Sequence, residues 1–164
     1  MHSRVFKLQS DFTKEFCQIK EEDYEENGFV GGIADYVQEE NTEDTVNSYN
    51  WLQDSSLGKV VSVEIGEVSK ETLPDATLTV DREKAREFLE ERAKEIVERF
   101  ISEGAQGFGW EMREAVGGAK FGFYFDIDGS YYTDVEFLSY CLTYKPEETR
   151  YIKFRLEGTL DYHS

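Results

Sequence analysis

Residues 81–103 carry the clearest periodic pattern in the sequence. Their apolar side chains recur every three or four positions, which is the spacing of one face of an α-helix. Charged residues of both signs fill the remaining positions, and Gly104 follows as a helix terminator. The pattern predicts one long amphipathic helix, which needs a second layer to cover its apolar stripe. The stripe consists of Ala85, Phe88, Leu89, Ala93, Ile96, Val97 and Phe100.

Alternating apolar and polar residues predict β-strands in other parts of the chain. The alternation is plain in 59–68 and 149–160, and a shorter stretch occupies 4–8. The Asp128-Gly129 pair stands between two further alternating stretches and is typical of a β-hairpin turn. We therefore expect a mostly antiparallel sheet on which the long helix packs.

No internal repeat, linker or break in composition divides the 164 residues, and this length is ordinary for one domain. The prediction is a single α+β domain, 1–164, with a β-rich C-terminal part, 118–161. Within that part, 135–142 fits a helix and a strand equally well. A glycine-rich connection is expected after the long helix, with a short helix near 110–115.

The N-terminal third also shows apolar residues at helical spacing, in three short segments. The glycine pair Gly31-Gly32 weakens the second segment, because each glycine costs about 1 kcal/mol in a helix relative to alanine. Thr42 or Thr45 could cap the third segment. We therefore expect 21–58 to be a folded helical subregion that carries aromatic residues. The three segments are 11–20, 29–37 and 46–52.

Charge is strongly segregated along the chain. The formal net charge is −17, and the stretch between Lys20 and Lys59 holds eleven acidic residues and no lysine or arginine. A block of one sign attracts basic surfaces and repels nucleic acid and anionic lipid. We therefore expect neither direct nucleic-acid binding nor membrane binding. The acids are Glu21, Glu22, Asp23, Glu25, Glu26, Asp35, Glu39, Glu40, Glu43, Asp44 and Asp54.

The composition indicates a folded protein, since 39% of the residues are apolar and 15% are aromatic. No signal peptide opens the sequence, and no apolar run approaches the roughly 20 residues that span a bilayer. Cys17 and Cys141 lie far apart. We expect a soluble, cytoplasmic protein with reduced thiols, a disulfide being the less favoured alternative. The sequence favours neither a monomer nor a dimer.

Five oxygen-bearing side chains fall within eleven positions of the C-terminal part, and oxygen ligands suit Ca²⁺ or Mg²⁺. The spacing departs from a calcium loop of the EF-hand type, because glycine is fourth instead of sixth and Phe137 occupies the twelfth position. A hairpin turn with solvated acids explains the same residues. Asp126, Asp128 and Asp134 remain the less favoured candidate ligands. The five side chains are those of Asp126, Asp128, Ser130, Asp134 and Glu136.

The parts of an active site are otherwise missing. The two histidines, His2 and His163, lie near the ends of the sequence, and no zinc-type spacing or phosphate-binding glycine motif occurs. Carboxylate pairs are uninformative among 35 acids. Lysine and arginine do gather near the C-terminus, but acids are interspersed among them. We therefore expect a non-enzymatic protein without a cofactor.

The remaining hypothesis concerns the acidic block, where aromatic residues are interleaved with the carboxylates. Ordered carboxylates resemble the charge of a nucleic acid, and they accept paired hydrogen bonds from arginine as phosphate does. We hypothesise a nucleic-acid mimic that occludes the basic nucleic-acid-binding surface of a partner protein, such as a nuclease. The expected contacts are Glu21, Glu22, Asp23, Glu25, Glu26, Asp35, Glu39, Glu40, Glu43, Asp44, Tyr24 and Trp51.

In size and composition the chain is comparable to the small acidic proteins by which phages and mobile elements block host nucleases, including anti-CRISPR and anti-restriction proteins. Two alternatives stay open. One is an immunity protein that covers the active site of a toxin nuclease, and the other is a plain acidic structural or interaction domain. A carboxylate-based, metal-dependent enzyme is the least favoured reading.

Overall fold

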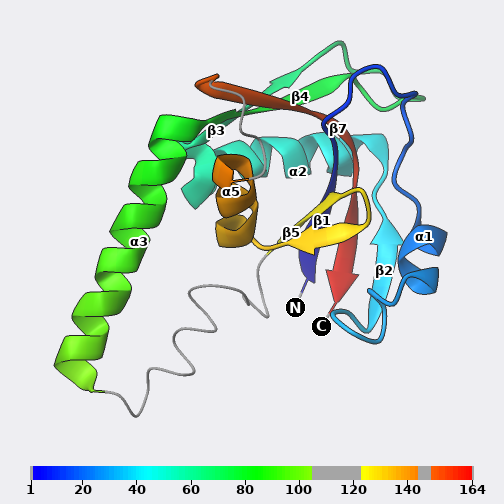
Figure 1. Ribbon diagram of the computed structural model, residues 1–164. Coiled ribbons are helices and arrows are strands. Elements are labelled where there is room, and N and C mark those ends of the chain that lie inside the picture. The colour runs from blue at the N-terminus through cyan, green and yellow to red at the C-terminus, as the bar shows by residue number, and fades with distance from the viewer. Residues whose placement is uncertain (1, 105–122, 144–148, 164) are drawn as a thin grey trace.

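The computed structural model describes residues 2–104, 123–143 and 149–163. These residues form an α+β domain, as expected, in which helices pack on a seven-stranded sheet (Figure 1). The elements in chain order are β1 (His2–Gln9), α1 (Glu21–Glu26), β2 (Tyr36–Glu39), α2 (Thr42–Asp54), a 3-10 turn η1 (Ser56–Lys59), β3 (Val61–Ile65), β4 (Ala76–Asp81), α3 (Arg82–Glu103), β5 (Tyr124–Ile127), β6 (Ser130–Tyr132), α5 (Asp134–Thr143) and β7 (Tyr151–His163).

The sheet is mostly antiparallel, as predicted. Its strand order is β3-β4-β7-β1-β5-β6, and β2 pairs with β7 outside this path. Only the pairing of β1 with β5 is parallel among the described strands. The long strand β7 pairs with β4 through its first half and with β2 through its second half, while β1 runs along its other edge. β7 is therefore the strand that joins the two halves of the sheet.

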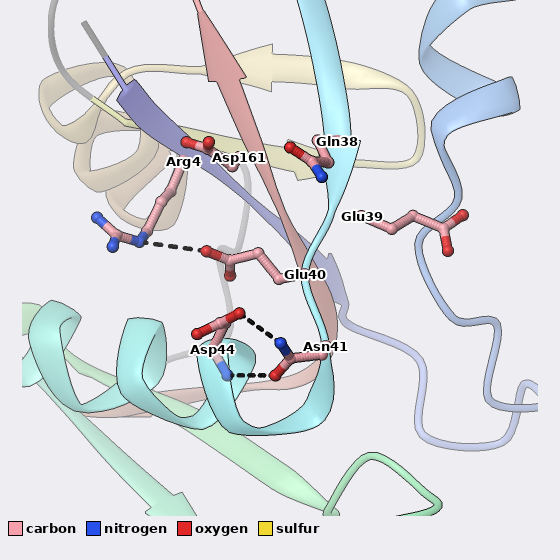
Figure 2. A pocket seen from close by; sticks show the side chains of 7 residues that line it. All are labelled: Arg4, Gln38, Glu39, Glu40, Asn41, Asp44 and Asp161. Atoms are coloured by element: carbon pink, nitrogen blue, oxygen red, sulfur yellow. Dashed lines mark hydrogen bonds and ion pairs between the residues drawn. The ribbon is translucent and has the colours of Figure 1, made fainter.

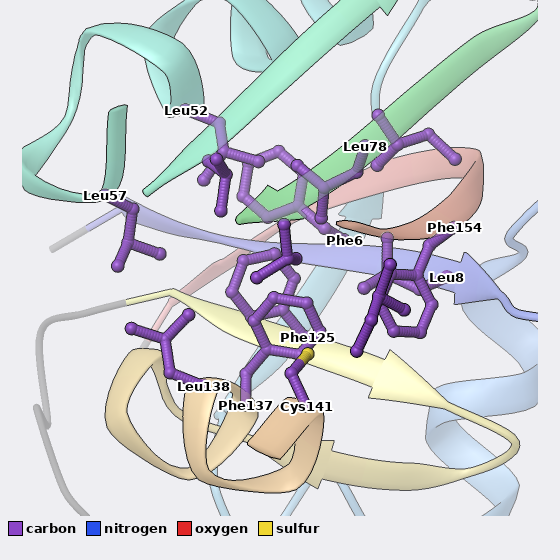
Figure 3. Packing of buried hydrophobic residues seen from close by; sticks show 14 of the residues in the cluster. Phe6, Leu8, Leu52, Leu57, Leu78, Phe125, Phe137, Leu138, Cys141 and Phe154 are labelled. Carbon is purple, nitrogen blue, oxygen red and sulfur yellow. The ribbon is translucent and has the colours of Figure 1, made fainter. Parts of the chain in front are cut away.

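One face of the sheet holds the larger hydrophobic core (Figure 3). Phe6 and Phe125 from neighbouring strands are fully buried there. Leu52 of α2 and Phe137 of α5 close over them, and the Phe125 and Phe137 ring centroids lie 4.1 Å apart. The amphipathic faces of α2 and α5 thus bury their apolar residues on this side.

The opposite face carries a second, smaller core. Val5 points to it, because adjacent residues of a strand project to opposite faces and Phe6 belongs to the larger core. Tyr24 of α1 and Phe29 cover this face together with Tyr162 of β7. The N-terminal acidic region is therefore attached to the sheet by buried aromatic rings.

A bulge in β7 allows one strand to supply both cores. Phe6 pairs with Thr159 but Leu8 pairs with Leu156, so β7 contains one residue more than β1 over this interval. Gly158 lies in the bulge with φ of 111°, a value that residues with a side chain rarely adopt. The side-chain alternation reverses there, so Leu156 faces the larger core and Leu160 the smaller one.

The long helix was predicted correctly in position but only partly in packing. Asp81 caps α3 by accepting hydrogen bonds from the backbone N–H groups of Glu83 and Lys84, and Gly104 ends it. Ala85 is fully buried near its start, whereas Val97 remains 54% exposed. The predicted apolar stripe therefore packs on the core only through its N-terminal part.

Two predicted N-terminal helices are wrong. Residues 11–20 form turns and extended chain in which Phe12 and Phe16 are exposed and only Ile19 is buried. Residues 29–37 form turns that lead into β2, because Gly31 has φ of 87° and the chain then pairs with β7. Their helical spacing was coincidental.

The third predicted N-terminal helix is present as α2, but neither predicted threonine is its cap. Asn41 accepts the capping hydrogen bond from Asp44 N at 2.9 Å. The undecided segment 135–142 is helical and lies within α5. The expected turn at Asp128-Gly129 joins β5 to β6, and both residues have positive φ. The expected short helix at 110–115 lies outside the described residues.

Candidate functional site

Helix α1 is fixed to the sheet by Tyr24. This side chain is 1% exposed, and its hydroxyl donates to Asp126 Oδ2 of β5 at 2.5 Å. Burial raises the pKa of Asp126 above its usual range and raises the pKa of Tyr24 as well. The Tyr24 ring also contacts Phe29 and Tyr131 edge-on or tilted. Tyr24 is thus an internal anchor, and its predicted role as an exposed contact is wrong.

The anchored helix presents four carboxylates to solvent. Glu22, Asp23, Glu25 and Glu26 are all exposed, and none of them forms an ion pair with a residue that the structure describes. Residues three or four apart on a helix have Cβ atoms about 5–6 Å apart. Because one buried residue holds the helix, these charges keep a defined arrangement relative to the sheet.

Two glutamates join α1 to the edge strand β2. The Glu39 backbone N–H donates to Glu21 Oε1 at 2.7 Å, and the Glu21 backbone N–H donates to Glu39 Oε1 at 3.3 Å. Each carboxylate therefore receives the amide of the other residue. This exchange places α1 beside β2, and β2 leads through Glu40 and Asn41 into α2. The acidic block therefore follows one connected path over the surface.

An acidic pocket of about 380 Å³ lies where β2 runs into α2 (Figure 2). Arg4, Asp161 and Gln38 are register neighbours on β1, β7 and β2, so their side chains share one face of the sheet. The first turn of α2 adds Asn41 and Asp44, whose side chains are hydrogen-bonded at 2.6 Å. The pocket thus combines elements that are far apart in sequence. It is lined by Arg4, Gln38, Glu39, Glu40, Asn41, Asp44 and Asp161.

Within this pocket Glu40 has an internal role. Its carboxylate accepts hydrogen bonds from the hydroxyls of Ser48, at 2.8 Å, and Thr159. Arg4 Nε lies 3.7 Å from Glu40 Oε1 and donates to Ser48 Oγ at 2.6 Å. The Arg4 guanidinium also lies 5.3 Å from the centroid of the Trp51 ring, which is 40% exposed. Glu40 is therefore compensated, while Trp51 stays accessible at the rim of this network.

The two other predicted contact acids are exposed. Glu43 lies in the first turn of α2, where a negative charge is favoured by the helix dipole. Asp35 precedes β2, and its Oδ2 lies 3.6 Å from His163 Nδ1. The His163 ring in turn stacks on Tyr36 at 5.4 Å between centroids. Of the predicted contacts, Tyr24, Glu21, Glu39, Glu40 and Asp44 thus make hydrogen bonds within the protein.

The candidate metal ligands have structural partners instead. Asp126 accepts from Tyr24 and from Gly129 N in the hairpin, and Asp128 pairs with Lys14 at 3.6 Å. Asp134 Oδ1 accepts from Val135 N at 2.8 Å at the start of α5. In the ranges that the structure describes, no three histidine, cysteine or acidic side chains are grouped so as to hold a metal ion.

Sequence reasoning missed the part of the site that comes from distant strands. Arg4 and Asp161 lie outside the acidic block, and only strand register brings them beside Gln38. No local pattern in the sequence points to this register, because the bulge at Gly158 shifts it by one residue.

Comparison with known proteins gave no match: no protein-family model fits the chain, and no curated protein or solved structure is significantly similar to it. None of the helices in the described ranges is both long and apolar enough to cross a membrane.

Proposed function

We propose that this protein binds a partner protein through the acidic surface formed by α1, β2 and the first turn of α2, and that it thereby occludes a basic surface on which the partner would hold nucleic acid. The four exposed carboxylates of α1 form the centre of this surface. The acidic pocket and the rim residue Trp51 extend it toward α2.

The attachment of α1 carries the proposal. A short helix with four like charges is unstable on its own, yet here Tyr24 and Asp126 hold it on the sheet through a buried hydrogen bond. Fixed charges lose less conformational entropy on binding than charges on a mobile tail. The arrangement therefore favours a recognition surface over a tail that merely increases solubility.

The acidic surface is chemically complementary to arginine and lysine side chains of a partner. Carboxylates accept paired hydrogen bonds from a guanidinium, and a segregated negative field increases the rate of encounter with a basic partner. The same field repels a nucleic acid, so the two would compete for the partner and not join in one complex. An exposed tryptophan beside the charges supplies the kind of aromatic contact that often dominates interface energies.

A charge-neutralised variant tests the proposal. Glu22→Gln, Asp23→Asn, Glu25→Gln and Glu26→Gln are combined, which removes four negative charges while Tyr24 is kept. A partner captured with the wild-type protein should be displaced by duplex DNA, and its affinity should fall steeply between about 50 and 200 mM salt. Binding of the variant should be at least tenfold weaker, because exposed charges at an interface each contribute a few tenths of a kcal/mol or more.

The matched control removes the same number of charges elsewhere. Glu87, Glu90, Glu91 and Glu103 are exposed on α3 and are changed to glutamine together. This control should bind as the wild-type protein does. Equal loss in both variants would show that total charge alone matters, and no loss in the α1 variant would exclude α1 as the contact. Circular dichroism and unfolding curves check that both variants are folded.

A further inference from the structure

Three arginines converge on one pocket of this acidic protein. The pocket has a volume of about 280 Å³ and lies between the first turns of α3 and the start of β7. In Figure 1 this end of α3 and helix α1 lie on opposite sides of the molecule. The basic pocket is therefore separate from the acidic surface. It is lined by Arg82, Glu83, Arg86, Thr149 and Arg150.

The position of these arginines opposes the usual preference of helix ends. The partial positive charge at a helix N-terminus favours acids there and disfavours bases. The first turns of α1, α2 and α5 follow this preference and carry acids only. The start of α3 also carries an acid, Glu83, but it places Arg82 and Arg86 four residues apart, where like charges repel by a few tenths of a kcal/mol.

Two of the arginines, Arg150 and Arg82, make contacts that stabilise the fold. Arg150 donates to Asp81 Oδ2 at 2.9 Å and lies 3.0 Å from Glu83 Oε2, which ties β7 to the start of α3. Arg82 donates to the carbonyl oxygens of Thr149 and Leu142 at 3.4 and 3.3 Å. These contacts fix both guanidinium groups at the wall of the pocket.

Arg86 differs from them in its contacts. It is exposed, and it makes no hydrogen bond or ion pair with any residue in the described ranges. Its guanidinium lines the pocket next to two arginines that are held in place, and its N–H groups can donate hydrogen bonds to a ligand. A bound anion would remove the repulsion between Arg82 and Arg86 and would use these donors.

We propose that the pocket between α3 and β7 binds the phosphate group of a small phosphorylated ligand. Arginine suits phosphate because its planar guanidinium forms two parallel hydrogen bonds to the oxygens. Recognition rests on these side chains, since the backbone N–H groups of Glu83 and Lys84 in the first turn already donate to Asp81 and that of Arg82 donates to the Arg150 carbonyl oxygen. The ring of Tyr151, 53% exposed and 5.3 Å from the Arg150 guanidinium, offers a flat surface to the organic part of the ligand.

The overall charge selects a small ligand over a nucleic acid. A net charge of −17 repels a polyanion, whereas one phosphate group places its charge only in the basic pocket. We therefore expect saturable binding of inorganic phosphate and of AMP, with a dissociation constant of about 1 mM or lower, and no comparable binding of duplex DNA.

Titration followed by nuclear magnetic resonance tests this proposal on the whole chain at constant ionic strength. Phosphate and AMP should shift the backbone amide signals of Thr149 and Arg150 in a saturable way. Arg86→Gln should weaken binding by about tenfold or more, because one charge-assisted contact is lost. Arg86→Lys should bind with intermediate affinity, since the charge remains but the paired donors do not.

The control is Arg99→Gln, which removes another exposed arginine, near the far end of α3. It should bind phosphate as the wild-type protein does. The proposal is overturned if phosphate and AMP cause no saturable shifts, if Arg86→Gln and Arg99→Gln weaken binding equally, or if duplex DNA binds more tightly than AMP. A stronger response to AMP than to phosphate would identify an organic phosphate ligand. Because the acidic surface is not involved, this result is independent of partner binding.

Discussion

At the scale of single residues, the contact between Tyr24 and Asp126 decides how the acidic helix is held. Asp126 is 5% exposed and accepts from the Tyr24 hydroxyl and from Gly129 N. Burial is the main cause of its raised pKa, and Asp128 raises it further, while these hydrogen bonds and Lys7 lower it. The folded state therefore favours the neutral carboxyl group more than the unfolded state does.

The contribution of Asp126 to stability therefore depends on pH in a defined way. Because the pKa of Asp126 is higher in the folded state, its contribution to stability is full below the unfolded value of about 3.9 and is lost as pH rises through the folded value. Asp126→Asn cannot ionise. The free energy of unfolding of the variant, relative to that of the wild-type protein, should therefore increase as pH rises from 4 upward. Urea unfolding across this pH range measures it, and a difference that is constant with pH would contradict it.

At the scale of elements, the bulge in β7 leaves no room for a side chain at Gly158. A Cβ atom at Gly158 would lie 2.6 Å from Cγ2 of Ile19, which is 2% exposed. The glycine N–H also donates to the Tyr49 hydroxyl at 3.0 Å. Both cores meet at this residue, so a change there affects the packing of α2 and of the 11–20 segment together.

We expect Gly158→Ala to lower the free energy of unfolding by about 2–5 kcal/mol, from backbone strain at positive φ and from the clash with Ile19. Gly31→Ala is the matched control. Its φ is 87°, but no atom lies within 4 Å of the added Cβ, so only the backbone strain remains. Denaturant unfolding should show a clearly smaller loss for the control, and equal losses would exclude the steric part of the explanation.

The local sequence predicts those elements whose formation depends only on neighbouring residues. The period of α3, its end at Gly104 and the Asp128-Gly129 turn depend on neighbouring residues, so local patterns are sufficient to predict them. Residues 29–37 have the helical spacing but are turned by Gly31 and paired with β7, and this tertiary pairing overrides the local pattern. Tyr24 looked like an exposed aromatic of the acidic block because its buried partner, Asp126, lies about a hundred residues away.

The candidate site could also be predicted only in part. The block of acids, including the exposed residues of α1, is evident in the sequence. The pocket could not be predicted, because Arg4 and Asp161 reach it only through the register of three strands. Nor does the periodicity of the sequence indicate that the carboxylates of Glu21 and Glu40 accept hydrogen bonds within the protein.

At the scale of the whole molecule, like charges are folded into one domain with few opposite partners. Among the described residues the ion pairs are few, and those that join two residues of α3 are at 3.7 Å or longer. The net charge of −17 therefore repels itself in the compact state more than in the unfolded chain.

Added salt should consequently stabilise the protein. We expect the melting temperature to rise as NaCl is increased from low to physiological concentration, by about 2–4 °C for each kcal/mol of repulsion that is screened. Differential scanning calorimetry at pH 7 measures this change. The α1 variant with four fewer charges should show a smaller rise, and a melting temperature that falls with salt would contradict the explanation. Salt thus has opposite effects on the stability of the protein and on its proposed binding.

The place of β7 in the sheet also has a consequence for synthesis. This strand is synthesised after the other strands that the structure describes, yet it lies between β1 on one side and β4 and β2 on the other. A nascent chain that lacks it has no partner for β2 and no complete core on either face. Non-local pairings of this kind form slowly and leave apolar surface exposed to proteases and chaperones until they close. We therefore expect the acidic surface to be complete only once β7 has paired, so that chains released before residue 151 should bind the proposed partner poorly.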